Sequence, residues 1–248
     1  MMIKNYLLAS VVVTAAMISS CCGVCSVGGS ESVRTLSGRT STLTFSPGNN
    51  YSAIDISTAI NVNYSVAPEC AVSVTLPEEY ASKLVVKVEK GTLKMTINGG
   101  VNLGNADKIT ATVSGPMPND IEVSSAAGFY LSRGDVPTDR SVNIEAASAA
   151  KVEIETLVCG NIEIDSSSAS VVNINSLKCA NLDIETSSAS KASIDNVSAN
   201  RVVIDSSSAS NVYVAGKSDV VNIESSSASH VNASSLKSND GKAEASSG

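Results

Sequence analysis

The fold is decided by a repeat in residues 161–210, which read NIEIDSSSAS VVNINSLKCA NLDIETSSAS KASIDNVSAN RVVIDSSSAS. The phrase Ser-Ser-Ala-Ser returns throughout this stretch and has close copies on both sides of it. The central serines of these copies are Ser148, Ser168, Ser188, Ser208 and Ser227. Their spacing is constant except at the last step, which is one residue shorter than the others. A period of about 20 residues is typical of solenoid proteins, in which each repeat forms one coil.

Within each unit, apolar and polar residues alternate with a period of two, which predicts β-strands. Ile162 and Ile164 occupy one face of the first strand, while Glu163 and Asp165 occupy the other. The alternation returns after the serine turn and once more before the next unit, so each coil has three short faces. Antiparallel hairpins do not easily repeat an identical column once in every unit. Coils stacked about 4.8 Å apart do, so the repeat predicts a parallel β-helix.

The composition favours the same architecture. The chain has no Trp and is 3% aromatic, so Val, Ile, Leu and Ala must fill the core. The β-branched members of this set favour strands over helices. A single coil buries too little apolar surface to offset the entropy that its backbone loses, so at least three coils must stack. No segment after Pro47 shows a sustained helical period, which excludes a helical solenoid.

We therefore predict an all-β, single-domain parallel β-helix with about 20 residues per coil over residues 50–248. Residues 124–248 hold the regular Ser-rich repeats. Residues 50–123 contain strand-like segments at less regular spacing. We expect these segments to form irregular coils that continue into the regular ones.

The N-terminus has the features of an export signal. Lys4 is followed by an apolar run that extends from Tyr6 to Ile18. A membrane span needs roughly 20 residues, so this shorter run matches the core of a signal peptide instead. The run ends in Ile18-Ser19-Ser20-Cys21, which resembles a bacterial lipoprotein box. We predict a signal peptide over residues 1–20 and a diacylglycerol anchor on the Cys21 thiol. The alternative is an ordinary cleavable signal followed by an incidental cysteine.

A lipid anchor at Cys21 implies that the protein contacts a membrane through lipid and belongs to the cell envelope, at the outer membrane. Residues 21–49 are rich in Ser, Thr and Gly, and we predict a flexible tether there. No acidic cluster follows Cys21 to indicate a leaflet. Periplasmic and surface-facing placements both stay open.

Charge and residue usage exclude several functions. The net charge is −7 and the pI is about 4.8, with no basic stripe, so we expect no nucleic-acid partner. His230 is the single histidine, which removes most nucleophile–base schemes that need an imidazole. We expect His230 to be a solvated surface residue.

Three phrases and the repeated corners carry a resemblance to a known family. The phrases are IDISTAINV at residues 54–62, KGTLKMTI at 90–97 and IEVSSAAG at 121–128. In this order they are similar to the putative auto-transporter adhesin, head GIN domain family of Gram-negative lipoproteins, over residues 50–248. The resemblance implies a right-handed parallel β-helix, an adhesion-like role and no catalytic residues. That family usually has Ser-Gly corners, and the alanine used here tolerates positive φ less well than glycine.

The repeat also stacks acidic residues. One outward column contains Glu145, Asp165, Glu185, Asp205 and Glu224. Beside it, Glu163 and Asp183 begin a second column, which creates a patch of four carboxylates: Glu163, Asp165, Asp183 and Glu185. Carboxylates so placed could hold a weakly bound Ca²⁺ ion, with water completing its shell. The alternative that we favour is a solvated face that binds no metal, in which case the protein needs no cofactor.

Cys159 and Cys179 share one column of the repeat and should be stacked neighbours. Their expected Cα separation lies within the range of a disulfide. Inward columns more often hold small unpaired thiols, which is the alternative that we favour.

We predict a protein without catalytic activity, whose solenoid surface serves adhesion-like binding or scaffolding toward an envelope or host glycan or protein. One alternative is a carbohydrate-active β-helix enzyme, because paired carboxylates catalyse glycoside hydrolysis. These carboxylates recur in every coil, however, and Tyr213 is the sole aromatic residue after Tyr130. Another alternative is a structural lipoprotein of the envelope without a specific ligand. The oligomeric state stays open, although a weakly apolar last coil, with Ala243 and Ala245, could invite end-to-end association.

Overall fold

The structure, a computed structural model, describes residues 39–48, 50–99 and 109–246. The predicted signal peptide, Cys21 and the first part of the tether lie outside these residues. Within the described part of the chain, no helix has both the length and the apolar character needed to cross a membrane.

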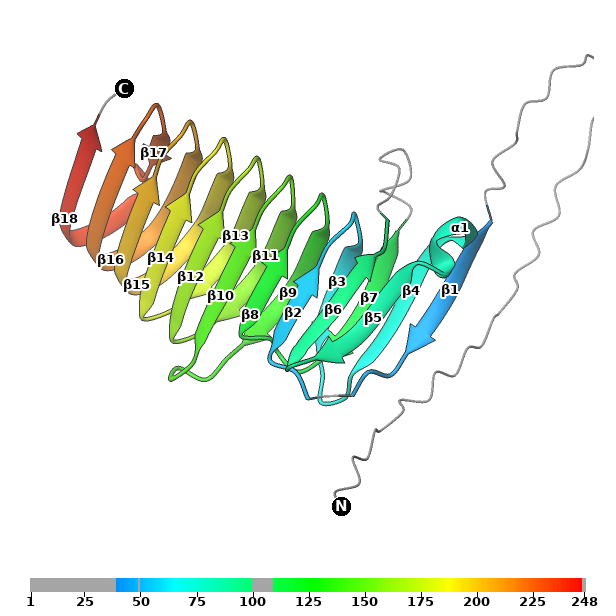
Figure 1. Cartoon of the computed structure of the whole chain (residues 1–248). Helices are drawn as coiled ribbons and strands as arrows, with labels where there is room; N and C mark the ends of the chain where they lie inside the picture. The colour runs from blue at the N-terminus through cyan, green and yellow to red at the C-terminus, as the bar shows by residue number, and fades with distance from the viewer. Residues whose placement is uncertain (1–38, 49, 100–108, 247–248) are drawn as a thin grey trace, which may run out of the picture.

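The described chain forms an elongated β-solenoid, with β1 near one end and β18 at the other (Figure 1). Parallel strands pair from coil to coil, which confirms the predicted all-β solenoid with one repeat unit in each regular coil. Two broad faces, called face A and face B, contain most of the strands. In each regular coil a serine corner leads from face A to face B, and a bend then leads to a narrow third face.

Face A is built from strands that precede the serine corners. In spatial order it contains β5 (Leu84–Glu89), β6 (Thr92–Ile97), β2 (Ala53–Ile56), β8 (Asp120–Val123), β10 (Ser141–Ala146), β12 (Asn161–Ser166), β14 (Asn181–Thr186), residues 201–206 of β15 (Lys191–Ser206), residues 220–226 of β16 (Asn211–Ser226) and residues 240–246 of β18 (Leu236–Ser246). All neighbours on this face are parallel except β5, which is antiparallel to β6.

Face B is built from strands that follow the serine corners. In spatial order it contains β1 (Thr40–Phe45), β4 (Ala71–Pro77), β7 (Thr110–Gly115), β3 (Asn61–Val66), β9 (Gly128–Asp135), β11 (Lys151–Val158), β13 (Val171–Lys178), residues 191–194 of β15, residues 211–214 of β16 and β17 (His230–Asn232). A four-residue helix, α1 (Glu78–Ala81), follows β4 and contacts β1 and β4.

Equivalent side chains of successive coils stand above one another. Ile164 pairs with Ile184 and Ile184 with Ile204, and all three have no exposed surface. Burying such a column stabilises every coil against its neighbours, since each isoleucine contributes roughly 1.5–3 kcal/mol when removed from water. The column arrangement on which the sequence argument depends is therefore confirmed.

Each serine corner turns through two residues with left-handed backbone. In the corner after β12, Ser168 has a φ of 53° and Ala169 a φ of 63°. The Ala169 N–H donates to the Ser188 carbonyl oxygen of the next coil at 3.0 Å. Left-handed geometry costs a non-glycine residue roughly 1–2 kcal/mol. The chain keeps the corner with alanine in place of glycine, and the hydrogen bond to the next coil helps to hold it.

Hydroxyl groups fill the inside of these corners. Ser166 and Ser170 are almost fully buried, and their Oγ atoms lie 2.8 Å apart. The Ser170 hydroxyl donates to the Ala146 carbonyl oxygen at 2.8 Å, and Ser190 repeats this bond to Ser166 at 2.6 Å. Because every buried hydroxyl named here has a partner, the serines cost little to bury.

The structure corrects the N-terminal boundaries. The tether predicted for residues 21–49 is wrong at its end, because Thr40–Phe45 forms β1 and pairs antiparallel with β4. Leu43 and Phe45 alternate with threonines and pack against the core. This alternation is typical of a strand, but the segment was assigned to the tether because it is rich in Ser and Thr. Residues 50–123 also differ from simple irregular coils, since β4 and β5 are antiparallel to their neighbours. The regular part is then continuous with this end, as expected.

Candidate functional site

A column of acidic side chains runs along face A. The parallel register stacks the five acids expected from the repeat, and it extends the column by two coils toward the N-terminus and by one coil toward the C-terminus. The complete acid column contains Asp55, Glu122, Glu145, Asp165, Glu185, Asp205, Glu224 and Glu244. The added members escaped sequence reasoning because the intervals from Asp55 to Glu122 and from Glu122 to Glu145 differ from the interval of the regular repeat, and because the phrase Ser-Ser-Ala-Ser does not follow Glu244.

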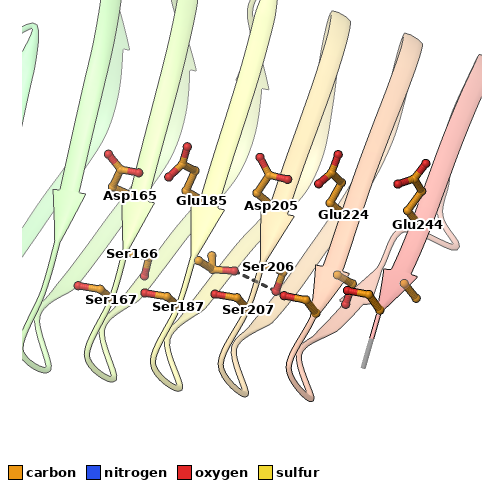
Figure 2. A pocket seen from close by; sticks show the side chains of 15 residues that line it. Asp165, Ser166, Ser167, Glu185, Ser187, Asp205, Ser206, Ser207, Glu224 and Glu244 are labelled. Atoms are coloured by element: carbon orange, nitrogen blue, oxygen red, sulfur yellow. Dashed lines mark hydrogen bonds between the residues drawn. The ribbon is translucent and has the colours of Figure 1, made fainter. Parts of the chain in front are cut away.

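A groove accompanies the C-terminal half of the acid column. Its volume is about 810 Å³. Five carboxylates, from Asp165 to Glu244, form one row, and a row of hydroxyls that includes Ser167, Ser187 and Ser207 forms the other (Figure 2). These serines begin the corners, so the same turn that closes each coil also places a hydroxyl beside each carboxylate. The groove offers hydrogen-bond acceptors and negative charge at the spacing of the coils.

Most of the negative charges of the groove, those of Asp165, Glu185, Asp205 and Glu224, form no ion pair within the described residues. Within the described residues, the ion pairs of the acid column lie at its two ends, where Asp55 pairs with Lys94 at 3.3 Å and Glu244 pairs with Lys242. Partial burial raises the pKa of Asp165, and the charge of Glu145 raises it further. The pKa of Glu185 is raised chiefly by the charge of Asp165. Such mutual repulsion favours the approach of a positively charged partner.

The patch predicted to hold calcium is formed as two side-by-side pairs. Glu163 lies opposite Asp183, and Asp165 lies opposite Glu185, on β12 and β14. Alternate residues of a strand are about 7 Å apart, so the two pairs do not converge on one point. In residues 39–48, 50–99 and 109–246, no group of three or more His, Cys, Asp or Glu side chains is arranged to hold a metal ion. The geometry therefore gives the calcium alternative no support.

The two stacked cysteines, Cys159 and Cys179, are buried and form no disulfide with each other. Burial raises the pKa of Cys159 to about 11 and that of Cys179 to about 12. The charge of the Cys159 thiolate adds to the effect on Cys179. Neutral thiols are poor nucleophiles, so these cysteines pack as small apolar side chains in their column.

The features expected of a sugar-cleaving site are not gathered in either groove. The acidic groove has no aromatic lining residue. A second, smaller groove of about 350 Å³ crosses β11, β13 and β15, and its lining, which includes Glu153, Asn173 and Asp195, also lacks aromatic rings. His230 lies exposed on β17, far along the chain from the acids of the central coils. Neither groove thus provides the stacking platform that carbohydrate enzymes use.

The family of the chain is identified by sequence. A family model described as "Putative auto-transporter adhesin, head GIN domain" matches residues 50–248. Among curated proteins, none matches the chain.

Solved structures share the fold. A putative adhesin from Bacteroides fragilis is 17% identical, with a TM-score of 0.65, and the match covers 86% of this chain and 97% of that one. A putative adhesin from Parabacteroides merdae is 16% identical, with a TM-score of 0.60 and the same coverage of both chains. A putative lipid binding protein from Parabacteroides distasonis is 15% identical, with a TM-score of 0.61, and the match covers 85% and 93%. At these identities the likeness concerns the fold alone.

Proposed function

We propose a binding function for this chain, which belongs to the head GIN domain family of putative auto-transporter adhesins. In this proposal the protein is anchored to the outer membrane through lipid on Cys21 and presents its solenoid to an envelope or host component. The acid column and its groove form the binding surface. The observation that carries the proposal is the repetition of one carboxylate and one hydroxyl in each coil, without convergence on a single reacting point.

A repeating surface suits an extended partner. Asp165, Glu185 and Asp205 stand on successive strands, and one strand spacing is about 4.8 Å. A protein segment with several Lys or Arg residues can neutralise several of these carboxylates at once, and each new contact then gains from the last. Serine hydroxyls beside the acids can donate hydrogen bonds to peptide or sugar groups and can accept hydrogen bonds from them. We therefore favour a cationic protein segment over a neutral glycan as the partner.

Two other functions are weighed against this one. A carbohydrate-active enzyme needs a dedicated pair of carboxylates at one place, whereas here equivalent carboxylates recur from coil to coil. A structural lipoprotein without a ligand would use the acid column for solubility alone. That second alternative is distinguished by the binding experiment below.

A role in lipid binding, which the name of one solved relative states for that protein, takes a restricted form here. The interior of the solenoid is filled by side chains such as Ile164, Ile184 and Ile204, which have no exposed surface. A lipid tail therefore has no room inside the described coils. We assign contact with lipid to the anchor on Cys21.

The test compares the wild-type mature chain with an Asp165→Asn, Glu185→Gln, Asp205→Asn variant. Both are immobilised, and their binding of poly-L-lysine, of dextran and of purified envelope fragments is measured at rising salt. We expect salt-sensitive binding of poly-L-lysine and of fragments that the triple variant loses. Glu153→Gln, a substitution outside the acidic groove, serves as the matched control and should bind like the wild type. Equal binding by the wild type and the triple variant would exclude the acidic groove as the binding surface.

The location is tested separately. Protease treatment of intact cells should shave the solenoid if it faces outward and spare it if it faces the periplasm. Cys21→Ser should release the protein from the membrane fraction. Retention of this variant in the membrane would contradict the lipid anchor.

A further inference from the structure

The solenoid has four strands whose outer edge has no partner in the described chain. β5 and β18 are the outermost strands of face A, and β1 and β17 are the outermost strands of face B. Each pairs on one side only. Unpaired backbone N–H and C=O groups on such edges readily pair with another chain.

The core is only partly covered behind these edges, and at the N-terminal end α1 covers part of it with the buried Tyr80. At the N-terminal end, Leu43, Phe45 and Val86 pack against the core but remain partly exposed. At the C-terminal end, Val231 and Leu236 also pack against the core and remain partly exposed. No described element covers the outer edge of β17 or of β18. Both ends of the solenoid therefore keep partly exposed apolar side chains that stacking on another coil would bury further.

The two ends are stepped in complementary ways. Counted from the coil that contains β2 and β3, face B extends three strands toward the N-terminal end and face A two, so that β1 protrudes. Toward the C-terminal end, face A extends seven strands and face B six, so that β18 protrudes. Each face thus holds ten described strands. A second copy placed end to end meets both steps at once, with β18 against β5 and β17 against β1.

The registers carried along the two faces predict the contacts of that junction. On face A, Lys87 belongs to the column that ends at Glu244, and Glu89 belongs to the column that ends at Lys242. Pairing β18 of one copy with β5 of the next in the same columns places Glu244 beside Lys87 and Lys242 beside Glu89. Both pairs join opposite charges, and directly opposite pairs of this kind stabilise a sheet.

The apolar columns also continue across the junction. Val86 and Val88 share their columns with Ala245 and Ala243, so these four side chains meet on the inner side of face A. On face B, Leu43 shares its column with Val231. Small residues on β18 thus face large ones on β5, which suits close packing.

We propose that copies of this chain associate head to tail, the C-terminal end of one solenoid docking on the N-terminal end of the next. The occupant of both open ends is a second copy, because the steps, the apolar columns and the charge pairs match between the two ends of one molecule. Since the two contacting surfaces differ, the association does not close at a dimer and builds a linear filament. This inference does not rest on the proposed binding function.

The test is a charge-exchange experiment on the full mature chain. Sedimentation velocity and small-angle scattering follow the size of the wild type, of Lys87→Glu, of Glu244→Lys and of the variant with both changes. We expect the wild type to grow beyond a dimer as its concentration rises. Each single variant should weaken the association constant about tenfold, since it sets like charges opposite one another. The double variant should regain most of the loss.

Lys178→Glu is the matched control, because it makes the same change of charge on an exposed residue of β13, away from both ends. Circular dichroism of every variant verifies that it is folded. Three results overturn the proposal: a wild type that stays monomeric up to about 1 mM, single variants no weaker than Lys178→Glu, or a double variant as weak as the singles. A size that saturates at a dimer overturns it as well.

Discussion

Neutralising one carboxylate in the middle of the acid column should stabilise the fold. Glu185 stands between Asp165 and Asp205 in the parallel register, on adjacent strands. A unit charge about 5 Å away in water repels it by about 0.8 kcal/mol. At about 0.1 M salt the Debye length is about 10 Å, which lowers each repulsion to about 0.5 kcal/mol. Removing the charge of Glu185 relieves both neighbours.

Glu185→Gln should therefore raise the free energy of unfolding by about 1 kcal/mol at pH 7, which corresponds to a rise in melting temperature of about 2–4 °C. Urea unfolding followed by circular dichroism measures the change. At about 1 M salt the Debye length is about 3 Å, and the gain should largely vanish. Glu153→Gln is the control, because Glu153 pairs with Lys151 at 2.5 Å and its neutralisation should not stabilise. A Glu185→Gln variant that is no more stable than the wild type, or whose gain persists at high salt, would refute the electrostatic reasoning.

Three more outcomes follow from the same structure. The pKa values of Asp165 and Asp183 are raised chiefly by burial and by neighbouring acids, so the folded protein holds these protons more tightly than the unfolded chain. Their contribution to the free energy of unfolding should rise as pH falls from 7 through the raised pKa values, and level off below the ordinary value of about 4. Urea midpoints for the wild type and for Asp183→Asn measure this contribution. A midpoint unaffected by Asp183→Asn would contradict the prediction. Ala189 has a left-handed backbone, so Ala189→Gly should stabilise the fold by up to about 1 kcal/mol and Ala189→Val should destabilise it. Thermal melting measures both changes. Equal melting temperatures of the two variants would count against backbone strain at the corner. Cys159 and Cys179, which are buried and have raised pKa values, should react with a disulfide reagent only after urea unfolds the chain; fast reaction of the native protein would contradict this.

The regular coils could be predicted from the sequence because one local pattern specifies a long-range register. Once Ser168, Ser188 and Ser208 recur at one constant interval, Ile164, Ile184 and Ile204 must stack, and so must Asp165, Glu185 and Asp205. The acid column was therefore foreseeable through its five central members. Its outer members were not, since the interval from Asp55 to Glu122 is set by an excursion through other strands.

The N-terminal end could not be predicted, because its strands pair across long and unequal intervals. The alternation in Thr40–Phe45 is compatible with a strand, yet nothing local announces that β4 is its partner or that the pair is antiparallel. The inward serines were missed for a different reason. Ser166 and Ser170 look like solvated turn residues in sequence, and only the stacked corners provide the carbonyl oxygens that allow their burial.

The hydrogen bond from each corner to the following one has a consequence for how such proteins change length over evolution. Because the Ala169 N–H is satisfied by Ser188 and the Ala189 N–H by Ser208 in the same manner, duplication of one unit leaves every donor with an equivalent acceptor. An inserted copy of one unit disturbs no contact elsewhere and lengthens the rod by one strand spacing, about 4.8 Å. Duplication or loss of repeat units can thus change the length of the solenoid in uniform steps of one coil.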